Sequence, residues 1–210
     1  MMITISDELL KIIPFFHIIA YTMEVANQKT MEVENLIKEL KTSYQLEDVC
    51  SIPLIKCARD AYKALGKDPS HTRVAAEALI RRVIKGNLEP LGDLIDLGNY
   101  LSVILERSVC VVDLGKLKGD VRIDIGASGE VVEAIGRLPI NATNLITYRD
   151  EEGIFGSPTS DSVRTMITKE TKQILIMLIC FDNEDTNPLR EQIINIYQKY
   201  ANAKEIKKVL

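Results

Sequence analysis

The chain has 210 residues, which is enough to bury a substantial core and fits one large domain or two small ones. Hydrophobic residues make up 46% of it and charged residues 27%, the proportions of an ordinary globular protein. The formal net charge of −4 excludes a global electrostatic attraction for nucleic acid. Any RNA contact therefore needs a local basic patch or a partner that delivers the RNA, and no DNA specificity is indicated.

The cysteines and the apolar runs indicate the cellular compartment of the protein. The four cysteines form no Cys-x-x-Cys pair and no zinc-ligand spacing, and Cys110 and Cys180 stand in apolar surroundings. Such cysteines are typical of free buried thiols in a reducing compartment. The longest apolar run, residues 12–21, is too short to span a bilayer and lacks the features of a signal peptide. We therefore expect a cytoplasmic protein with no membrane segment.

The first half of the chain begins with strand patterns and becomes mainly helical. Short β-rich apolar runs predict strands at residues 3–5 and 15–21, with Pro14 at the start of the second. Pro53 suits the first turn of a helix, and Ser70 is the expected N-terminal cap of the next one. Apolar residues at helical spacing predict four helices, over residues 29–44, 51–65, 70–85 and 91–105.

After Ser108 the pattern changes to short β-branched runs separated by glycine-rich and polar turns. These runs predict strands at residues 109–114, 121–125, 131–135, 144–148 and 173–181. A final helix begins at Asn187 and is followed by a basic tail over residues 204–208. No repeat or linker divides the chain. The sequence therefore predicts one α+β domain over residues 1–210, a helical N-terminal half packed on a mixed or antiparallel β-sheet core.

The segment over residues 153–164 concentrates polar chemistry and offers little for a core. Glycine allows backbone to approach a ligand closely, and loops carry binding sites disproportionately. The segment is therefore either a polar turn between two strands or the wall of a ligand pocket. Its glycines, hydroxyls and charged groups are Gly153, Gly156, Ser157, Thr159, Ser160, Asp161, Ser162 and Arg164.

Other polar residues also have competing interpretations. Arg59 belongs either to a solvated helix face or to a contact with a phosphate or carboxylate. Asp96 and Asn99 share a helix face in an apolar segment, so they either brace a loop or face a cavity. We interpret His17 as a core histidine and His71 as solvated. No metal constellation, Walker loop or dinucleotide fingerprint is present, so neither metal nor cofactor is expected.

Four short elements in a fixed order carry a family resemblance. Residues 93–100 read Asp-Leu-Ile-Asp-Leu-Gly-Asn-Tyr and residues 109–114 read Val-Cys-Val-Val-Asp-Leu; residues 116–130 include two glycines at matching places, and residues 153–156 read Gly-Ile-Phe-Gly. Together they resemble the editing region (domains three and four) of the bacterial phenylalanyl-tRNA synthetase beta subunit, and in detail its stand-alone relatives. The resemblance covers about residues 59–181, with a strand and helix extension over 1–58 and a C-terminal helix over 182–210.

The resemblance implies a fold like that editing domain and a pocket between the helix of Asn99 and residues 153–162. In the synthetase this module hydrolyses tyrosine wrongly attached to the phenylalanine tRNA. The implied partners are therefore tRNA or an aminoacyl or amino-acid ligand; an enzyme of this kind would be an aminoacyl-tRNA ester hydrolase, not a complete tRNA ligase. Arg59 or Arg164 would hold a carboxylate or phosphate. The other implied ligand-binding residues are Asn99, Gly153, Gly156, Ser157, Thr159, Ser160 and Asp161.

Two departures from the family pattern affect the implied catalysis. By the spacing from Asn99, the histidine of the editing region falls at Cys110, and a glutamate after its glycine pair falls near Pro158. Two groups that position water or substrate are thus absent, and Asp161 is the one candidate to replace them. The alternative is a non-catalytic module that kept the fold and binds an amino-acid-like small molecule. A third hypothesis, protein interaction through the N-terminal helices, has no positive indication in the sequence.

Overall fold

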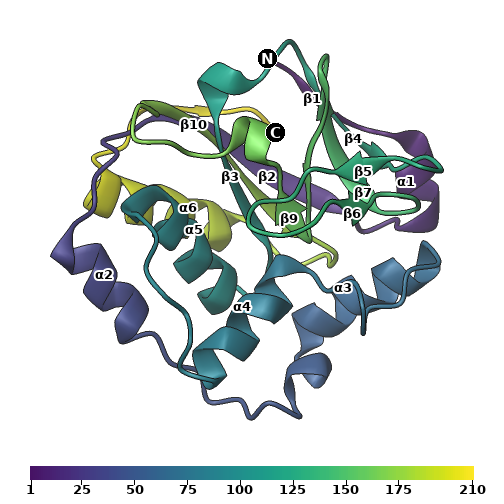
Figure 1. The fold of residues 1–210 in the computed structure, drawn as a ribbon, viewed down its shortest axis with the longest axis horizontal. Helices are drawn as coiled ribbons and strands as arrows, with labels where there is room; N and C mark the ends of the chain where they lie inside the picture. Colours follow the sequence, from purple (N-terminus) through teal and green to yellow (C-terminus); the bar gives the residue numbers. More distant parts are fainter.

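The protein is an α+β fold of six α-helices and two main β-sheets, seen in a computed structural model that describes residues 1–210 (Figure 1). The helices are α1 (Asp7–Ile12), α2 (Met31–Lys38), α3 (Pro53–Ala64), α4 (Ala75–Ile84), α5 (Asp93–Ile104) and α6 (Asn187–Ala201). Short 3-10 turns follow at η1 (Val49–Ser51), η2 (Leu114–Lys116) and η3 (Val163–Thr165). The strands are β1 (Ile3–Ile5), β2 (His17–Glu24), β3 (Val109–Asp113), β4 (Val121–Ile125), β5 (Val131–Val132), β6 (Ile140–Asn141), β7 (Ile146–Asp150), β8 (Gly153–Ser157), β9 (Ser160–Asp161), β10 (Gln173–Cys180) and β11 (Lys204–Lys208).

The two main sheets confirm the mixed α+β class that the sequence predicts. One sheet has the strand order β1-β4-β7-β8-β9, the other has the order β11-β2-β10-β3, and β5 pairs with β6 in a small ribbon. The pair β1 and β4 is parallel, and every other strand pair is antiparallel. None of the helices has the length and apolar character needed to cross a membrane.

Strand β10 has a nearly uninterrupted apolar sequence because both of its faces are covered, one by helices and the other by the five-stranded sheet. Side chains alternate along a strand, so successive residues face opposite sides of the sheet. Ile176 and Leu178 pack with residues of α5 and α6, whereas Leu175 and Met177 pack with the five-stranded sheet. A strand covered on both faces needs apolar residues at every position. The four-stranded sheet is therefore sandwiched between helices and the second sheet (Figure 1).

The helices follow their sequence patterns except at some ends. Pro53 stands at the first position of α3, as predicted. The prediction that Ser70 caps a helix is wrong, because its backbone N–H and its hydroxyl both donate to Asp68 Oδ1 and close a turn instead. Helix α4 begins at Ala75, and α2 ends at Lys38, earlier than the predicted residue 44. Helix α1 was not predicted.

The strand predictions have three corrections. The segment 153–164 is not a loop: Gly153–Ser157 is strand β8, hydrogen-bonded on both sides within the five-stranded sheet. The basic tail is strand β11, whose lysines suit the exposed edge of a sheet. The predicted strand at residues 131–135 has only two paired residues, in β5.

The histidines lie outside the core. The interpretation of His17 as a core residue is wrong, since it is partly exposed at the first position of β2, with its Nδ1 3.0 Å from the Phe15 carbonyl oxygen. His71 is solvated, as expected, because 86% of its side chain is exposed. Neither histidine is available to a buried site.

Candidate functional site

Helix α5 forms one wall of the candidate site through residues on a single helical face. Ile95, Gly98 and Asn99 stand at positions i, i+3 and i+4, so they present to the same side. A Cβ atom at Gly98 would come within 2.7 Å of Val111 Cγ2, so glycine allows α5 to lie directly against β3. The close contact fixes how far Asn99 stands from the strand.

The sequence left open whether Asp96 and Asn99 brace a loop or face a cavity, and in the structure each residue does one of the two. Asp96 is buried, and its Oδ2 accepts hydrogen bonds from the backbone N–H groups of Leu91 (3.0 Å) and Gly92 (2.9 Å). Burial raises the pKa of this carboxyl. Asp96 therefore braces the loop before α5, whereas Asn99 faces a hollow.

The hydroxyls of the β8–β9 hairpin are used to build the turn. Ser157 Oγ accepts hydrogen bonds from the backbone N–H groups of Thr159 and Ser160, both at 3.2 Å. The Thr159 hydroxyl lies 2.9 Å from the Tyr62 hydroxyl and ties the hairpin to α3. Gly156 packs closely against Tyr148, where a Cβ would meet the ring at 3.0 Å. These groups hold the hairpin and place Asp161.

Asp161 and Asn99 line the same hollow, a cavity of about 150 Å³ that we call the α5–β9 pocket. They are its two polar side chains, and Asp161 is its single titratable one. A dry apolar cavity of this size can hold a benzene-sized group. The other lining residues are Leu91, Ile95, Gly98, Val109, Val111, Ile135, Met166 and Ile167.

The surroundings of Asp161 raise the pKa of its carboxyl toward neutral pH. Burial raises its pKa from 3.8 to about 6, although hydrogen bonds from the Cys110 thiol and the Val111 amide on β3 oppose the rise. Burial also raises the pKa of Cys110 well above its ordinary value, so this residue stays a neutral thiol. A carboxyl with a pKa near neutrality in a cavity is a recognised mark of functional sites.

The two arginines of the predicted site have partners elsewhere. Arg59 Nη1 donates to both carboxylate oxygens of Glu77, at 3.0 and 2.9 Å, and to the Pro69 carbonyl. Arg164 donates to both oxygens of Asp150, at 3.0 and 2.7 Å. Neither arginine lines the α5–β9 pocket. The carboxylate that Arg59 contacts thus belongs to the protein itself.

Among the predicted ligand-binding residues, the structure brings only Asn99 and Asp161 together at the pocket. The others on the hairpin, which are Gly153, Gly156, Ser157, Thr159 and Ser160, do not line it. The apolar walls of the pocket are not among the residues that the sequence predicts. Ile95 could have been found from its helical spacing to Asn99, but Ile135 and Met166 arrive through tertiary structure alone. No three His, Cys, Asp or Glu side chains lie close enough together to hold a metal ion.

Comparisons with known proteins identify relatives of the chain. It is 28% identical over 111 residues to the phenylalanine–tRNA ligase beta subunit of Bartonella quintana (strain Toulouse), a match that covers 52% of this chain and 14% of the relative. It is 30% identical over 97 residues to the same subunit of Bartonella henselae, covering 45% of this chain and 12% of the relative. The matches thus span about one seventh or less of these relatives' length.

A solved structure and a family model extend this result to most of the chain. An N-terminal fragment of the phenylalanyl-tRNA synthetase beta subunit from Pyrococcus horikoshii superposes with a TM-score of 0.50 at 10% identity, covering 98% of this chain and 50% of that one. At this identity the match concerns the fold alone. The model of the B3/4 domain matches residues 57–209. The chain therefore belongs to the B3/4 domain family, which relates it to phenylalanine–tRNA ligase beta subunits.

Proposed function

We propose that the protein binds the aminoacyl group of an aminoacyl-tRNA in the α5–β9 pocket and hydrolyses mischarged aminoacyl-tRNA in trans. One observation carries this proposal: Asn99 of α5 and Asp161 of β9, far apart in sequence, line one small cavity with otherwise apolar walls. The relation to phenylalanine–tRNA ligase beta subunits supports the choice of ligand.

The pocket suits the side chain of an aromatic amino acid. Its apolar walls favour a ring by removing it from water, and its volume of about 150 Å³ matches one ring. The Asn99 amide can donate and accept hydrogen bonds, and the Asp161 carboxylate accepts them. A few polar groups on apolar walls are what orient a ligand in a typical binding site. Tyrosine is the amino acid that uses both the walls and the polar groups.

Asp161 is the group that we assign to proton transfer. Above pH 6 its carboxylate is mostly ionised and can take a proton from a water that attacks the ester carbonyl carbon. The bond between that carbon and the ribose oxygen then breaks, and the ribose oxygen receives a proton. The products are a free amino acid and a tRNA with its terminal hydroxyl restored. Cys110 is not the nucleophile, because its raised pKa keeps it protonated.

The test is release of free tyrosine from tyrosylated phenylalanine tRNA, with and without the protein. We expect acceleration by the wild type and a loss of about 100-fold in Asp161→Asn, the usual size of a general-base contribution. Asp185→Asn is the matched control, since Asp185 is exposed in the loop before α6 and should leave the rate unchanged. No acceleration for tyrosine or any other common mischarged pair would exclude the hydrolase.

The second candidate function is a non-catalytic module that binds an amino-acid-like molecule. The positions where the family pattern has a histidine and a glutamate hold Cys110 and Pro158, and both are buried. The Pro158 carbonyl accepts hydrogen bonds from Ala75 and Ser108, so this position serves the packing of α4. A thermal-shift screen of amino acids and nucleotides separates the candidates. Stabilisation by a free small ligand, with no tRNA shift on a gel, favours the binding module.

A further inference from the structure

We propose that a second hollow, adjoining the α5–β9 pocket, holds the ribonucleotide to which the aminoacyl group is attached, with Lys169 on its phosphate. This inference rests on the proposed function and names the second half of its ligand. We call the site the Lys169 hollow. It is lined by Asn27, Gln28, Lys29, Leu91, Gly92, Leu94, Ile95, Ile167, Thr168 and Lys169.

The two hollows are adjacent because they share three wall residues, Leu91, Ile95 and Ile167. The Lys169 hollow has a volume of about 480 Å³, whereas the α5–β9 pocket has about 150 Å³. Sites for complete small ligands usually measure about 300 to 1,000 Å³. The smaller pocket therefore has room for one part of a ligand, and the adjoining hollow has room for a nucleoside.

The Lys169 hollow has more polar and charged residues in its lining than the α5–β9 pocket, although Leu91, Leu94, Ile95 and Ile167 give it apolar walls as well. Gln28 and Thr168 bring an amide and a hydroxyl of the kind that bind ribose hydroxyls and base edges, whereas the Asn27 amide N–H already donates to the Thr168 carbonyl oxygen. Two lysines and no carboxylate line it. Lys29 lies 3.5 Å from Glu34, whereas Lys169 has no carboxylate within 4 Å. Lys169 is therefore the cation that is free to pair with a phosphate.

The N-terminus of α5 does not supply the positive charge that would bind a phosphate in the Lys169 hollow. Its preceding backbone N–H groups, at Leu91 and Gly92, already donate to the Asp96 carboxylate. A phosphate in the hollow would consequently depend on the lysine ammonium and not on the helix terminus. This dependence makes a charge change at position 169 a sharp test.

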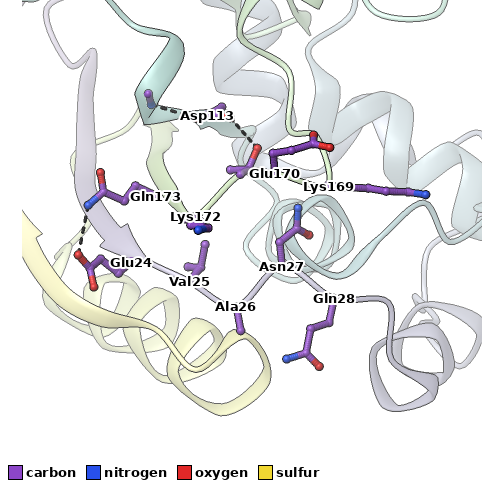
Figure 2. Close-up of a pocket in the computed structure, with 12 residues that line it drawn as sticks. Glu24, Val25, Ala26, Asn27, Gln28, Asp113, Lys169, Glu170, Lys172 and Gln173 are labelled. Atoms are coloured by element: carbon purple, nitrogen blue, oxygen red, sulfur yellow. Dashed lines mark hydrogen bonds between the residues drawn. The ribbon is translucent and has the colours of Figure 1, made fainter.

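The charges beyond Lys169 limit the inference to one nucleotide and its phosphate. A third hollow, of about 800 Å³, shares Asn27, Gln28 and Lys169 with the Lys169 hollow (Figure 2). Its walls carry three carboxylates, at Glu24, Asp113 and Glu170, against two lysines, Lys169 and Lys172. Figure 2 shows the Lys169 side chain extending away from Asp113. Carboxylates repel a continuing chain of phosphates, so this surface does not favour a long nucleic-acid track.

The ligands for the test separate the parts of the proposed substrate. Tyrosinamide carries the acyl part alone. Tyrosine joined by a stable amide to 3′-amino-3′-deoxyadenosine adds the nucleoside, and the same compound with a preceding cytidylate adds one phosphodiester. Tyrosinol adenylate carries its phosphate between the tyrosyl group and the nucleoside, and it stands for a free aminoacyl adenylate. Binding of each is measured by calorimetry at several salt concentrations.

Lys169→Glu is compared with Lys11→Glu, which makes the same charge change on an exposed residue of α1. We expect Lys169→Glu to weaken the cytidylate-bearing ligand by about tenfold and to leave tyrosinamide unchanged. The logarithm of the wild-type affinity for that ligand should fall with the logarithm of salt with a slope of roughly −0.7, the value for one phosphate contact. Lys11→Glu should match the wild type with every ligand.

Equal effects of the two charge changes on the cytidylate-bearing ligand would overturn the Lys169 hollow. In that case binding of tyrosinamide, with its loss in Asn99→Ala, would still uphold the proposed function. If no tyrosyl compound binds the wild type, the proposed function itself fails. An effect of Lys169→Glu confined to tyrosinol adenylate would support the phosphate contact and assign it to a free adenylate instead of an RNA end.

Discussion

Glu77 and Asp161 are two carboxylates with little access to water and opposite surroundings. Glu77 on α4 is fully buried, and Arg59, Arg73 and Arg81 all lie within 3.5 Å of its oxygens. Asp161 on β9 forms no ion pair with an arginine or lysine, and the Cys110 thiol and the Val111 backbone amide are the groups that oppose the rise of its pKa. Glu77 is thus surrounded by three cationic side chains, whereas Asp161 faces a pocket with mainly apolar walls.

The difference separates a structural charge from a functional one. A buried carboxylate that pairs with several cations holds together the elements that carry them, here α3 and α4. A carboxylate without cations has a raised pKa and weakens the fold whenever it is ionised. Proteins keep such a group where function requires it, and stability is given up in exchange.

Glu77→Gln should destabilise the protein by about 3 kcal/mol, because it removes a fully buried charge and leaves three partly exposed guanidinium groups without their counter-charge. Urea unfolding at neutral pH measures the change. Glu34→Gln is the control, since Glu34 on α2 pairs with the exposed Lys29 and Lys38 and its substitution should cost less than about 1 kcal/mol. Comparable losses in the two variants would contradict the structural role of Glu77.

Asp161→Asn should raise the free energy of unfolding by about 1 to 2 kcal/mol at pH 7.5 while it removes activity. The pKa of about 6 is above the value of 3.8 expected in the unfolded chain. The protonated form therefore favours folding; this contribution is complete below pH 4 and is lost as the pH rises through 6. The full shift corresponds to about 3 kcal/mol, and we expect less because the side chain keeps some contact with solvent.

The same urea experiment at pH 4 provides the control for Asp161→Asn. Wild type and variant should then have nearly equal stability, because the wild-type carboxyl is protonated. A variant less stable than the wild type at pH 7.5 would show that Asp161 supports the fold, contrary to this account.

Tyr62 and Tyr148 extend the contrast to two fully buried hydroxyls. The Tyr62 hydroxyl lies 2.9 Å from that of Thr159, whereas the Tyr148 hydroxyl has no hydrogen-bond partner. Tyr62→Phe should cost about 1 kcal/mol because it leaves Thr159 unpaired. Tyr148→Phe should be neutral or slightly stabilising, since it removes an unsatisfied group. Thermal unfolding of both variants measures the two costs, and a larger loss for Tyr148→Phe than for Tyr62→Phe would contradict this contrast.

Asn99→Ala should have the smallest effect on stability, within about 0.5 kcal/mol, because the side chain is partly exposed in the pocket and bonds to nothing in the protein. Binding of tyrosinamide should nevertheless weaken by about tenfold, through loss of its hydrogen bonds. Calorimetry compares the affinity with that of wild type. Destabilisation without loss of affinity would place Asn99 with the structural residues.

The sequence predicted the elements whose side-chain periodicity is continuous. The positions of α3, α5, β4, β10 and α6 follow from runs of apolar residues at spacing 3.6 or 2. It failed at β8 and β11, where polar residues are held by neighbouring strands and local pattern favours a loop. Ser70 shows the same limit, because a turn with Asp68 competes with capping.

The candidate site could be predicted only in part. The family resemblance pointed to Asn99 and Asp161, and helical spacing could have added Ile95. The hydroxyls at Ser157 and Thr159 were expected at the ligand, but a polar side chain in a hairpin can serve the turn equally well, and sequence does not show which. The sequence likewise does not show that Arg59 pairs with Glu77, because the two residues lie on different helices, α3 and α4.

The most direct test of the central claim is nuclear Overhauser contacts between the ring protons of bound tyrosyl-amino-deoxyadenosine and labelled methyl groups of the protein. The account predicts contacts to Ile95, Val111 and Met166, and their loss in Asp161→Asn or Asn99→Ala where binding is weakened. Saturable binding with ring contacts only to methyl groups outside the α5–β9 pocket would contradict it.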